Sequence, residues 1–400
     1  MAHNISIKQQ ANLVRLQELQ LSTARNSRLP DLLGGVGQNF SFGRGLTAEN
    51  TYTNTNTSST SFSLGTSIPL FTGFQIPNQI RLNQLNLDAA TADLEKAKND
   101  IRMQVAQAYV QILYRSQVAR LEALVSNGKA SEAELSQQRA TLANSLLTAT
   151  QADNNYRLSI LALTQLLELP TPDGFSVVRP DISGLSSLYG DSGQSGLSGL
   201  SPDAIYAEAL GIKPEIAAQQ FRLKGTENSI KIAKAAGLPT LSLSGGLGTN
   251  YYTTSGFPAD GFGKQLKNNF SQYVGLNLNV PIFNRFQTRN SIRSARIDQE
   301  SQQLQLDNTR KVLYKEIQQV YYNALNAQSK EKSSGEAVKS TADAFRLMQA
   351  KYENGKGTIT EFNEAKNNYL KSESDLVQAR YENLYQMALL EFYRGKELNF

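Results

Sequence analysis

The feature that most constrains this sequence is an internal repeat. Four segments of the first half recur in the same order in the second half, at offsets of 209, 212, 212 and 227 residues: Leu29-Pro30 as Leu238-Pro239, Ile68-Pro69-Leu70-Phe71 as Val280-Pro281-Ile282-Phe283, Tyr109 as Tyr321, and Asn127-Gly128-Lys129 as Asn354-Gly355-Lys356. Ordered self-similarity of this kind indicates a duplicated structural unit. The chain is therefore expected to fold as two similar halves.

Each half contains segments in which apolar and small polar residues alternate. The apolar residues of one such segment would share a face: Val274, Leu276, Leu278, Val280 and Ile282. The same period of two occurs around Phe62. This period indicates β-strands with one apolar and one polar face. We expect two strands per half, within residues 31–71 and 240–283, with polar loops at 47–60 and 253–268.

After each strand pair the apolar spacing changes to about seven residues. The first half shows it most clearly, at Leu87, Leu94, Ile101 and Ala108. Such spacing, with polar residues between, is typical of coiled-coil helices. We expect helices over residues 78–125 and 288–353, roughly 70 and 100 Å long at 1.5 Å per residue. Since the offset grows from 212 to 227 between Tyr109 and Asn127, the first helix is 15 residues shorter.

The domain organisation follows from this repeat. Residues 1–169 form the first unit and residues 214–400 the second, each with a helix, a β-hairpin, a long helix and a further helix. Residues 170–213 between them are rich in Gly, Ser and Pro. Such composition predicts an irregular linker, with a short helix beginning near Pro202.

The turn that follows each long helix has a clear local signal. Asn and Gly in the repeated Asn-Gly-Lys tolerate the left-handed conformation that a helix C-cap requires. Ser131 with Glu134, and Thr358 with Glu361, then have the spacing of a capping box at a new helix start. The sequence therefore predicts one tight hairpin between two helices in each half.

Composition excludes several functions. The chain has no cysteine and one histidine, His3. Thiol chemistry, disulfides, structural zinc and Ser-His-Asp catalysis need these residues, so no catalytic residue, cofactor or metal is expected and the chain is not predicted to be an enzyme. The net charge of +5 arises from Lys and Arg scattered among acidic residues, which argues against nucleic-acid binding. No apolar run approaches 18 residues, so no helix is expected to span a membrane.

Four strands with one apolar face leave an open question. An isolated sheet of this kind has unpaired edges, which are unfavourable in water and untenable in lipid. Either copies of the chain complete a membrane barrel, or the apolar faces pack into the core of a soluble β-domain. The strands have about the 9–11 residues that a tilted membrane strand needs.

The duplicated order of helix, Leu-Pro, β-hairpin, (Ile/Val)-Pro-(Leu/Ile)-Phe, long helix and Asn-Gly turn resembles the TolC-like outer membrane efflux protein family. The resemblance implies a mixed α and β fold, in which a long coiled-coil-like α-helical barrel is continuous with a transmembrane β-barrel built by a homotrimer, four strands per chain. It also implies a location in the outer membrane of a Gram-negative bacterium, among outer-membrane lipid, with a large periplasmic portion. The trimer would be the passive exit duct of a tripartite efflux or type I secretion system, with a periplasmic adaptor (membrane fusion) protein and an inner-membrane pump as partners.

The resemblance also implies a gate at the periplasmic helix tips. The family's gating tyrosine corresponds to Tyr352, and its acidic residues to Glu134, Glu361 and Glu364. An arginine often found in the family two residues after the second turn glycine is replaced here by Gly357. The residues expected at the adaptor-docking tips are Asn127, Gly128, Lys129, Ser131, Asn354, Gly355, Lys356 and Thr358. Glu134 and Glu361 could instead serve only as capping-box residues, and the two roles need not exclude each other.

The alternative reading is a soluble coiled-coil scaffold or adhesin with a small β-domain. The two readings differ in whether the apolar strand faces contact lipid or each other. The sequence begins within a predicted helix, so an export signal is expected to precede it.

Overall fold

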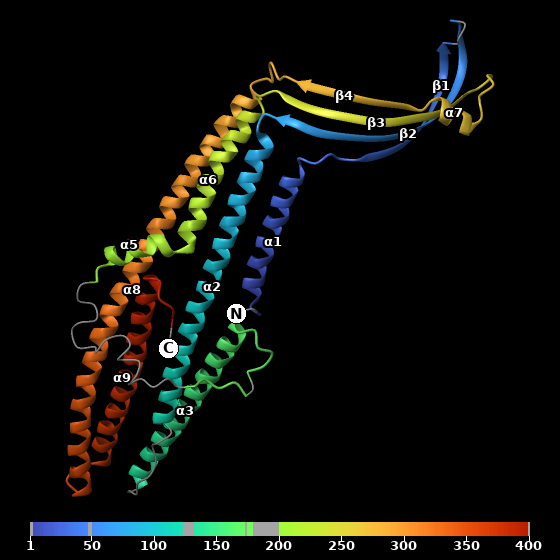
Figure 1. Ribbon diagram of the computed structural model, residues 1–400. Coiled ribbons are helices and arrows are strands. Elements are labelled where there is room, and N and C mark those ends of the chain that lie inside the picture. The colour runs from blue at the N-terminus through green and yellow to red at the C-terminus, as the bar shows by residue number, and fades with distance from the viewer. Residues whose placement is uncertain (1–2, 47–49, 123–131, 173, 179–199, 399–400) are drawn as a thin grey trace. The chain divides into compact units, whose positions relative to one another are not determined.

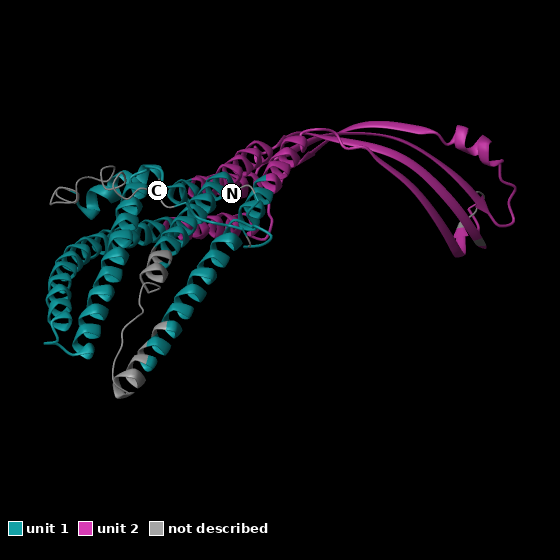
Figure 2. Cartoon of the chain, turned by 90° about the horizontal axis from the view of Figure 1, so that it is seen from below, with its two compact units in different colours: residues 1–14, 89–220, 304–400 teal, residues 15–88, 221–303 magenta. Residues whose placement is uncertain are grey.

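A computed structural model of the 400-residue chain describes residues 3–46, 50–122, 132–172, 174–178 and 200–398. It divides into two compact units, which Figure 2 distinguishes by colour. The sheet unit consists of Arg15–Asp88 and Phe221–Gln303, and the helical unit consists of Met1–Val14, Ala89–Gln220 and Leu304–Phe400.

Helices make up most of the chain. Their bounds are α1 Ile5–Asn26, α2 Gln75–Glu122, α3 Glu132–Leu166, α5 Pro202–Ile212, α6 Pro214–Ala235, α7 Phe262–Asn268, α8 Gln287–Glu353 and α9 Ile359–Tyr393. In the described part of the chain, no helix is both long and apolar enough to cross a membrane.

The sheet unit contains one antiparallel sheet of four strands in the order β1-β2-β3-β4 (Figure 1). The strands are β1 Leu33–Leu46, β2 Tyr52–Thr72, β3 Thr240–Thr254 and β4 Ser271–Asn279. The expected two strands per half are thus confirmed, and the strands of the two halves pair through β2 and β3. In the described chain, β1 and β4 each have a neighbour on one side only.

The strand register gathers the apolar residues on one face of the sheet. Leu64 lies opposite Leu247, and Leu243 lies opposite both Ile68 and Leu276. The other face carries small polar residues, such as Ser63 opposite Gly248. Since paired residues point to the same side, the alternation seen in the sequence is aligned across all four strands.

Three details of this sheet differ from the sequence-based expectation. A bulge between Pro69 and Phe71 places Phe71, not Leu70, opposite Leu241. The expected loop 47–60 is strand from Tyr52 onward, because its Thr-rich sequence suits a pleated strand and pairs with β1. The expected loop 253–268 contains helix α7, whose side chains bond to β3.

Helix α7 covers the part of β3 that extends beyond the end of β4. The Gln265 side-chain amide accepts a hydrogen bond from the Tyr252 N–H and donates one to the Tyr252 carbonyl, both at 3.0 Å. Asn269 donates to the Asn250 carbonyl at 2.8 Å. Side chains thus replace the missing strand partner, which the local sequence pattern does not reveal.

The two strand-to-helix junctions of the sheet unit have the same geometry. The rings of Phe71 and Phe74 lie 5.3 Å apart at 88°, and those of Phe283 and Phe286 lie 5.5 Å apart at 88°. In each junction the second phenylalanine and the residue before it have a positive φ, 61° and 66° at Gly73 and Phe74. The recurrence lies at the 212-residue offset of the sequence repeat.

In the helical unit, the predicted apolar spacing of the second half is confirmed as buried core. Leu306, Leu313, Ile317 and Val320 of α8 are all buried. Helix α8 has 67 residues and α2 has 48, so the first long helix is the shorter one, as expected. The predicted short helix is α5, whose Ser201 N-cap accepts a hydrogen bond from the Ala204 N–H.

Candidate functional site

The hairpin between α8 and α9 holds most of the gate residues expected from the sequence. Gly355 has a φ of +68°, and its N–H donates to the Tyr352 carbonyl at 3.0 Å. The Lys356 N–H donates to the Lys351 carbonyl at 2.9 Å, and the Asn354 side chain donates to the Ala350 carbonyl at 2.7 Å. These bonds satisfy the last carbonyl groups of α8, so the helix stop predicted from Asn-Gly is confirmed.

The capping box predicted at the start of α9 is also confirmed. The Glu361 N–H donates to the Thr358 hydroxyl at 3.2 Å, and the Thr358 N–H donates to the Glu361 carboxylate at 2.9 Å. The Thr358 hydroxyl also donates to this carboxylate. These bonds from Thr358, the backbone one first, hold the pKa of Glu361 below its ordinary value. Glu361 is therefore a fixed, solvent-exposed anion.

Tyr352 belongs to an aromatic stack that joins the two helices. Its ring stacks on Phe362 at 5.2 Å and 24°, Phe362 lies 5.6 Å from Phe345, and Phe345 stacks on Tyr369 at 5.8 Å and 5°. The four rings alternate between α8 and α9. Sequence reasoning identified only Tyr352, although the seven-residue spacing of 345 with 352 and of 362 with 369 is a signal that could have found the others.

Two further positions shape the charge of this tip. Glu364 is exposed, one turn beyond Glu361, and takes no part in the capping box. At Gly357, a Cβ atom would lie 3.3 Å from both the Lys351 Cβ and the Tyr352 nitrogen. A larger residue at 357 would require the end of α8 to shift, which gives a structural reason for glycine where the family often has arginine.

The equivalent hairpin of the first half cannot be compared in the same way. Asn127, Gly128, Lys129 and Ser131 lie outside the described residues. Glu134 lies in α3, but its side chain is outside the described part of the structure. The expected gate and docking roles of this tip therefore stay predictions.

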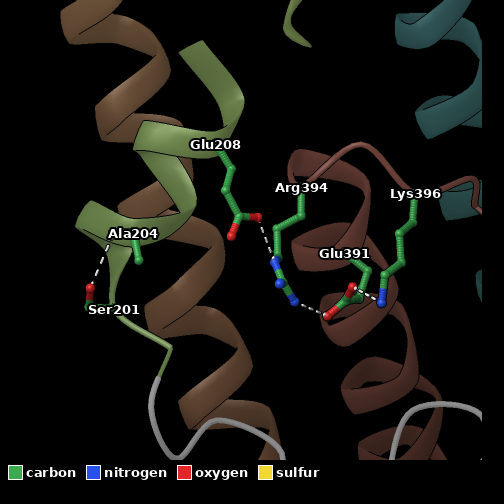
Figure 3. A network of polar contacts seen from close by, with 6 residues as sticks. All are labelled: Ser201, Ala204, Glu208, Glu391, Arg394 and Lys396. Atoms are coloured by element: carbon green, nitrogen blue, oxygen red, sulfur yellow. Dashed lines mark hydrogen bonds and ion pairs between the residues drawn. The ribbon is translucent and has the colours of Figure 1, made fainter. Parts of the chain in front are cut away.

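A second polar cluster, which sequence reasoning did not identify, fastens α5 to α8 and α9 (Figure 3). Arg394 donates to Glu208 of α5 at 2.9 Å and to Glu391 of α9 at 3.0 Å, and Lys396 pairs with the other oxygen of Glu391 at 2.6 Å. The hydrogen bond to Glu208 is the main reason why the pKa of Arg394 is raised.

The contact of α5 with α8 is made by Tyr314. Its hydroxyl donates to Asp203 at 2.8 Å, and its ring lies 5.1 Å from that of Tyr206. Ile205 and Ala209 on the same helix are fully buried. Helix α5 is thus a cross-brace between α8 and α9.

Lys213, between α5 and α6, is a buried cation. Only 6% of its surface is exposed, and its Nζ lies 4.0 Å from the Phe392 ring centre and 4.3 Å from that of Tyr393. Within the described chain, its ammonium group donates one hydrogen bond, to the Phe392 carbonyl at 3.4 Å. Burial lowers the pKa of Lys213 to about 8, against the opposing influence of Glu215, Glu316 and Asp100.

The apolar face of the sheet is the largest exposed feature of the chain. Val274 is 82% exposed, Phe42 76% and Val36 72%, although all three lie within strands. An apolar surface of this kind marks contact with a membrane or with another protein. Within the described ranges, no group of three or more His, Asp or Glu is placed to hold a metal ion.

Comparison with known proteins identifies this arrangement. Residues 205–395 match the family model described as outer membrane efflux protein. The chain is related to the outer membrane efflux proteins. This confirms the resemblance noted in the sequence, and the predicted outer-membrane location agrees with the family. The family is one of channels and not of enzymes, which also agrees with the prediction.

Relatives and solved structures extend the match to the rest of this efflux protein relative. It is 24% identical to the outer membrane protein OprJ of Pseudomonas aeruginosa over 189 residues, 47% of this chain and 38% of OprJ. It is 20% identical to the outer membrane efflux protein BepC of Brucella suis over 376 residues, 92% of this chain and 77% of BepC. The Campylobacter jejuni CmeC outer membrane channel has the same fold, with a TM-score of 0.78 and 17% identity over 100% of this chain and 84% of CmeC.

Proposed function

We propose that three copies of this chain form a channel-tunnel in the outer membrane, which serves as the passive exit duct of a tripartite efflux or type I secretion system. The observation that carries the proposal is the four-stranded sheet. It has one exposed apolar face, one face of small polar residues, and an edge at β1 and another at β4 that have no partner within the described chain.

The physical argument for a closed barrel rests on these edges. Unpaired strand edges are not tolerated in the hydrocarbon layer, because their N–H and C=O groups find no hydrogen-bond partner there. Known single-chain outer-membrane barrels have at least eight strands, so four strands must be completed by other copies. Three copies give twelve strands from residues 31–71 and 240–283, with the apolar face toward outer-membrane lipid and the Ser, Gly and Asn face toward a water-filled lumen.

We further infer that the chain arose by duplication of one unit. The matching geometry of the two strand-to-helix junctions supports this, as does the order of the repeated motifs. On this view residues 1–169 and 214–400 are the two repeats, and residues 170–213 form a linker. The helices of both repeats from three chains would then form the wall of a tunnel across the periplasm.

The helix tips are the proposed gate and docking surface. Threefold symmetry would repeat Glu361 and Glu364, together with Glu134 of the first half, as rings of negative charge around a narrow lumen, where they attract cations. Tyr352 would narrow the lumen beside them. The two hairpin turns, at residues 127–131 and 354–358, would contact a periplasmic adaptor and, with it, an inner-membrane pump. Cargo would pass without chemical change.

The orientation of the sheet gives the sharpest test. The chain has no cysteine, so single cysteines at adjacent β4 positions can be compared in the intact outer membrane with a small, water-soluble thiol reagent. Asn277→Cys should be labelled and Leu276→Cys should not, since the two side chains point to opposite faces. Equal labelling of both, in protein that is extracted without detergent, would favour the soluble scaffold and contradict the channel.

A further inference from the structure

The helical unit contains a cavity of about 880 Å³ with a mixed lining. It lies between α2, the end of α3, the segment 175–178, the α5–α6 junction and the end of α9. Its apolar wall includes Val105, Leu163, Leu167, Val177, Ile212 and Phe392. Its volume is within the range of sites that hold small molecules, roughly 300–1,000 Å³.

Two cations at this cavity have no carboxylate partner among the described residues. Arg102 donates to the Asn99 side-chain oxygen at 2.8 Å and is in no ion pair of the described chain. Lys213, though 94% covered, makes only the long bond to the Phe392 carbonyl and two ring contacts within that part of the chain. An ammonium group can donate three hydrogen bonds, so the buried Lys213 retains donors for an acidic group.

The other charged groups leave the cavity positive. Lys396 lines it but is already paired with Glu391, and Glu397 is the one carboxylate among the described lining residues. Glu215, Glu316 and Asp100 interact with Lys213 at longer range, and none of them is among the residues that line the cavity. The Tyr393 hydroxyl is directed to Glu316, at 3.4 Å.

We propose that this cavity binds an anionic amphiphile that has a carboxylate head and a single alkyl chain. The carboxylate meets Lys213 and Arg102, with which it forms charge-assisted hydrogen bonds. The alkyl chain lies along the wall formed by Val105, Leu163 and Leu167. The site is separate from the helix tips and the sheet, and it does not depend on the channel function proposed above.

The absence of tryptophan from the chain allows a direct test. Phe175→Trp places a single fluorophore on the cavity wall, and Leu347→Trp places one on an exposed position of α8 as the matched control. The full chain in lipid nanodiscs is titrated with 11-bromoundecanoate, whose bromine quenches tryptophan on contact, and with the neutral 11-bromoundecanol. The cavity fluorophore should be quenched saturably by the carboxylate probe, and the control fluorophore should not.

The charge dependence distinguishes a binding site from general apolar partition. On the Phe175→Trp background, Lys213→Met should weaken binding of the bromocarboxylate about tenfold or more, the usual size of a lost charge-assisted hydrogen bond, and should change the alcohol by less than about threefold. Arg102→Gln, at an exposed position, should shift binding in the same direction and guards against a folding defect of the first variant. Equal quenching of the cavity and control fluorophores, no saturable quenching of the cavity fluorophore, or unchanged carboxylate affinity in both charge variants would overturn the proposal.

Discussion

The Thr358 hydroxyl and the Glu361 carboxylate hydrogen-bond to each other and to each other's backbone N–H at the start of α9. This contact means that Glu361 has a structural role before any role in a gate is considered. Glu364 lies one turn further along the helix and has no part in the cap. The pair therefore allows capping and lumen charge to be separated by mutation.

Glu364→Gln is expected to weaken cation preference and raise single-channel conductance in planar bilayers while the melting temperature stays unchanged. Glu361→Gln should alter conductance in the same direction and also loosen the hairpin. Thr358→Ala keeps both carboxylates and removes the N-cap, at about 1 kcal/mol of helix stability, so it should leave ion selectivity close to that of the native chain. Unchanged currents in both glutamate variants would remove these residues from the gate.

Tyr352 is expected to act mainly through its stack with Phe362. Tyr352→Ala and Phe362→Ala should each destabilise the tip by about 1 kcal/mol or more, because an aromatic pair contributes roughly 0.5–1.5 kcal/mol beyond its buried area. Tyr352→Phe keeps the stack and should change little. Hydrogen exchange of the amides near residues 345–369 measures the effect. If Tyr352→Phe proved as damaging as Tyr352→Ala, the hydroxyl and not the stacked ring would be the important group.

Lys213 should make stability depend on pH in the alkaline range. Its pKa is about 8 in the folded chain against an ordinary value of 10.5, so between these values the unfolded chain binds more protons and stability rises with pH. Relative to Lys213→Met, the native chain should gain up to about 3 kcal/mol between pH 8 and 10.5. Lys213→Met should be at least as stable as the native chain at pH 7, since it removes a buried charge and keeps the packing.

Thermal unfolding of the two proteins from pH 7 to 10.5 measures this difference. Glu215, Glu316 and Asp100, which interact with Lys213, are present in both proteins, so changes in their own titration are largely shared. Parallel pH profiles would show that Lys213 keeps its ordinary pKa in the folded chain.

The two strand-to-helix junctions should respond in opposite ways to substitution. Gly73 has a φ of +61°, and a Cβ there would lie 2.8 Å from the Ala235 carbonyl oxygen. Gly73→Ala is therefore expected to destabilise the sheet unit by more than about 1–2 kcal/mol, the usual cost of a left-handed residue. Arg285, at the matching position, already has a φ of +54°, so Arg285→Gly should stabilise it by about 1 kcal/mol. Equal losses in both variants would contradict the shared geometry.

The elements of this chain that the sequence predicts well are those set by local pattern. The strand faces follow from period-two alternation, the long helices from seven-residue spacing, and the α8–α9 turn from Asn-Gly and the Thr358–Glu361 spacing. In each case the physical cause lies within a few residues of the effect. Helix α7, whose polar side chains replace a missing strand partner, escaped this kind of reasoning.

The contacts that the sequence does not reveal join distant parts of the chain. Glu208 and Arg394 are 186 residues apart, and Lys213 and Phe392 are 179 apart. Their side-chain types are common on any polar helix, so only the three-dimensional fold distinguishes them. The same holds for the candidate amphiphile site, whose lining comes from residues 99–214 and 392–398.

Disulfide trapping between the outer strands is the measurement that tests the central claim most directly. In this cysteine-free chain, Val274→Cys on β4 is combined in turn with Val36→Cys, Gln38→Cys or Phe40→Cys on β1, and the protein is oxidised in the outer membrane. Closure of three sheets into one barrel predicts that at least one pair yields covalent dimers and trimers, with nothing larger, on a denaturing gel. Monomers alone for every pair, or an open ladder of higher species, would contradict it.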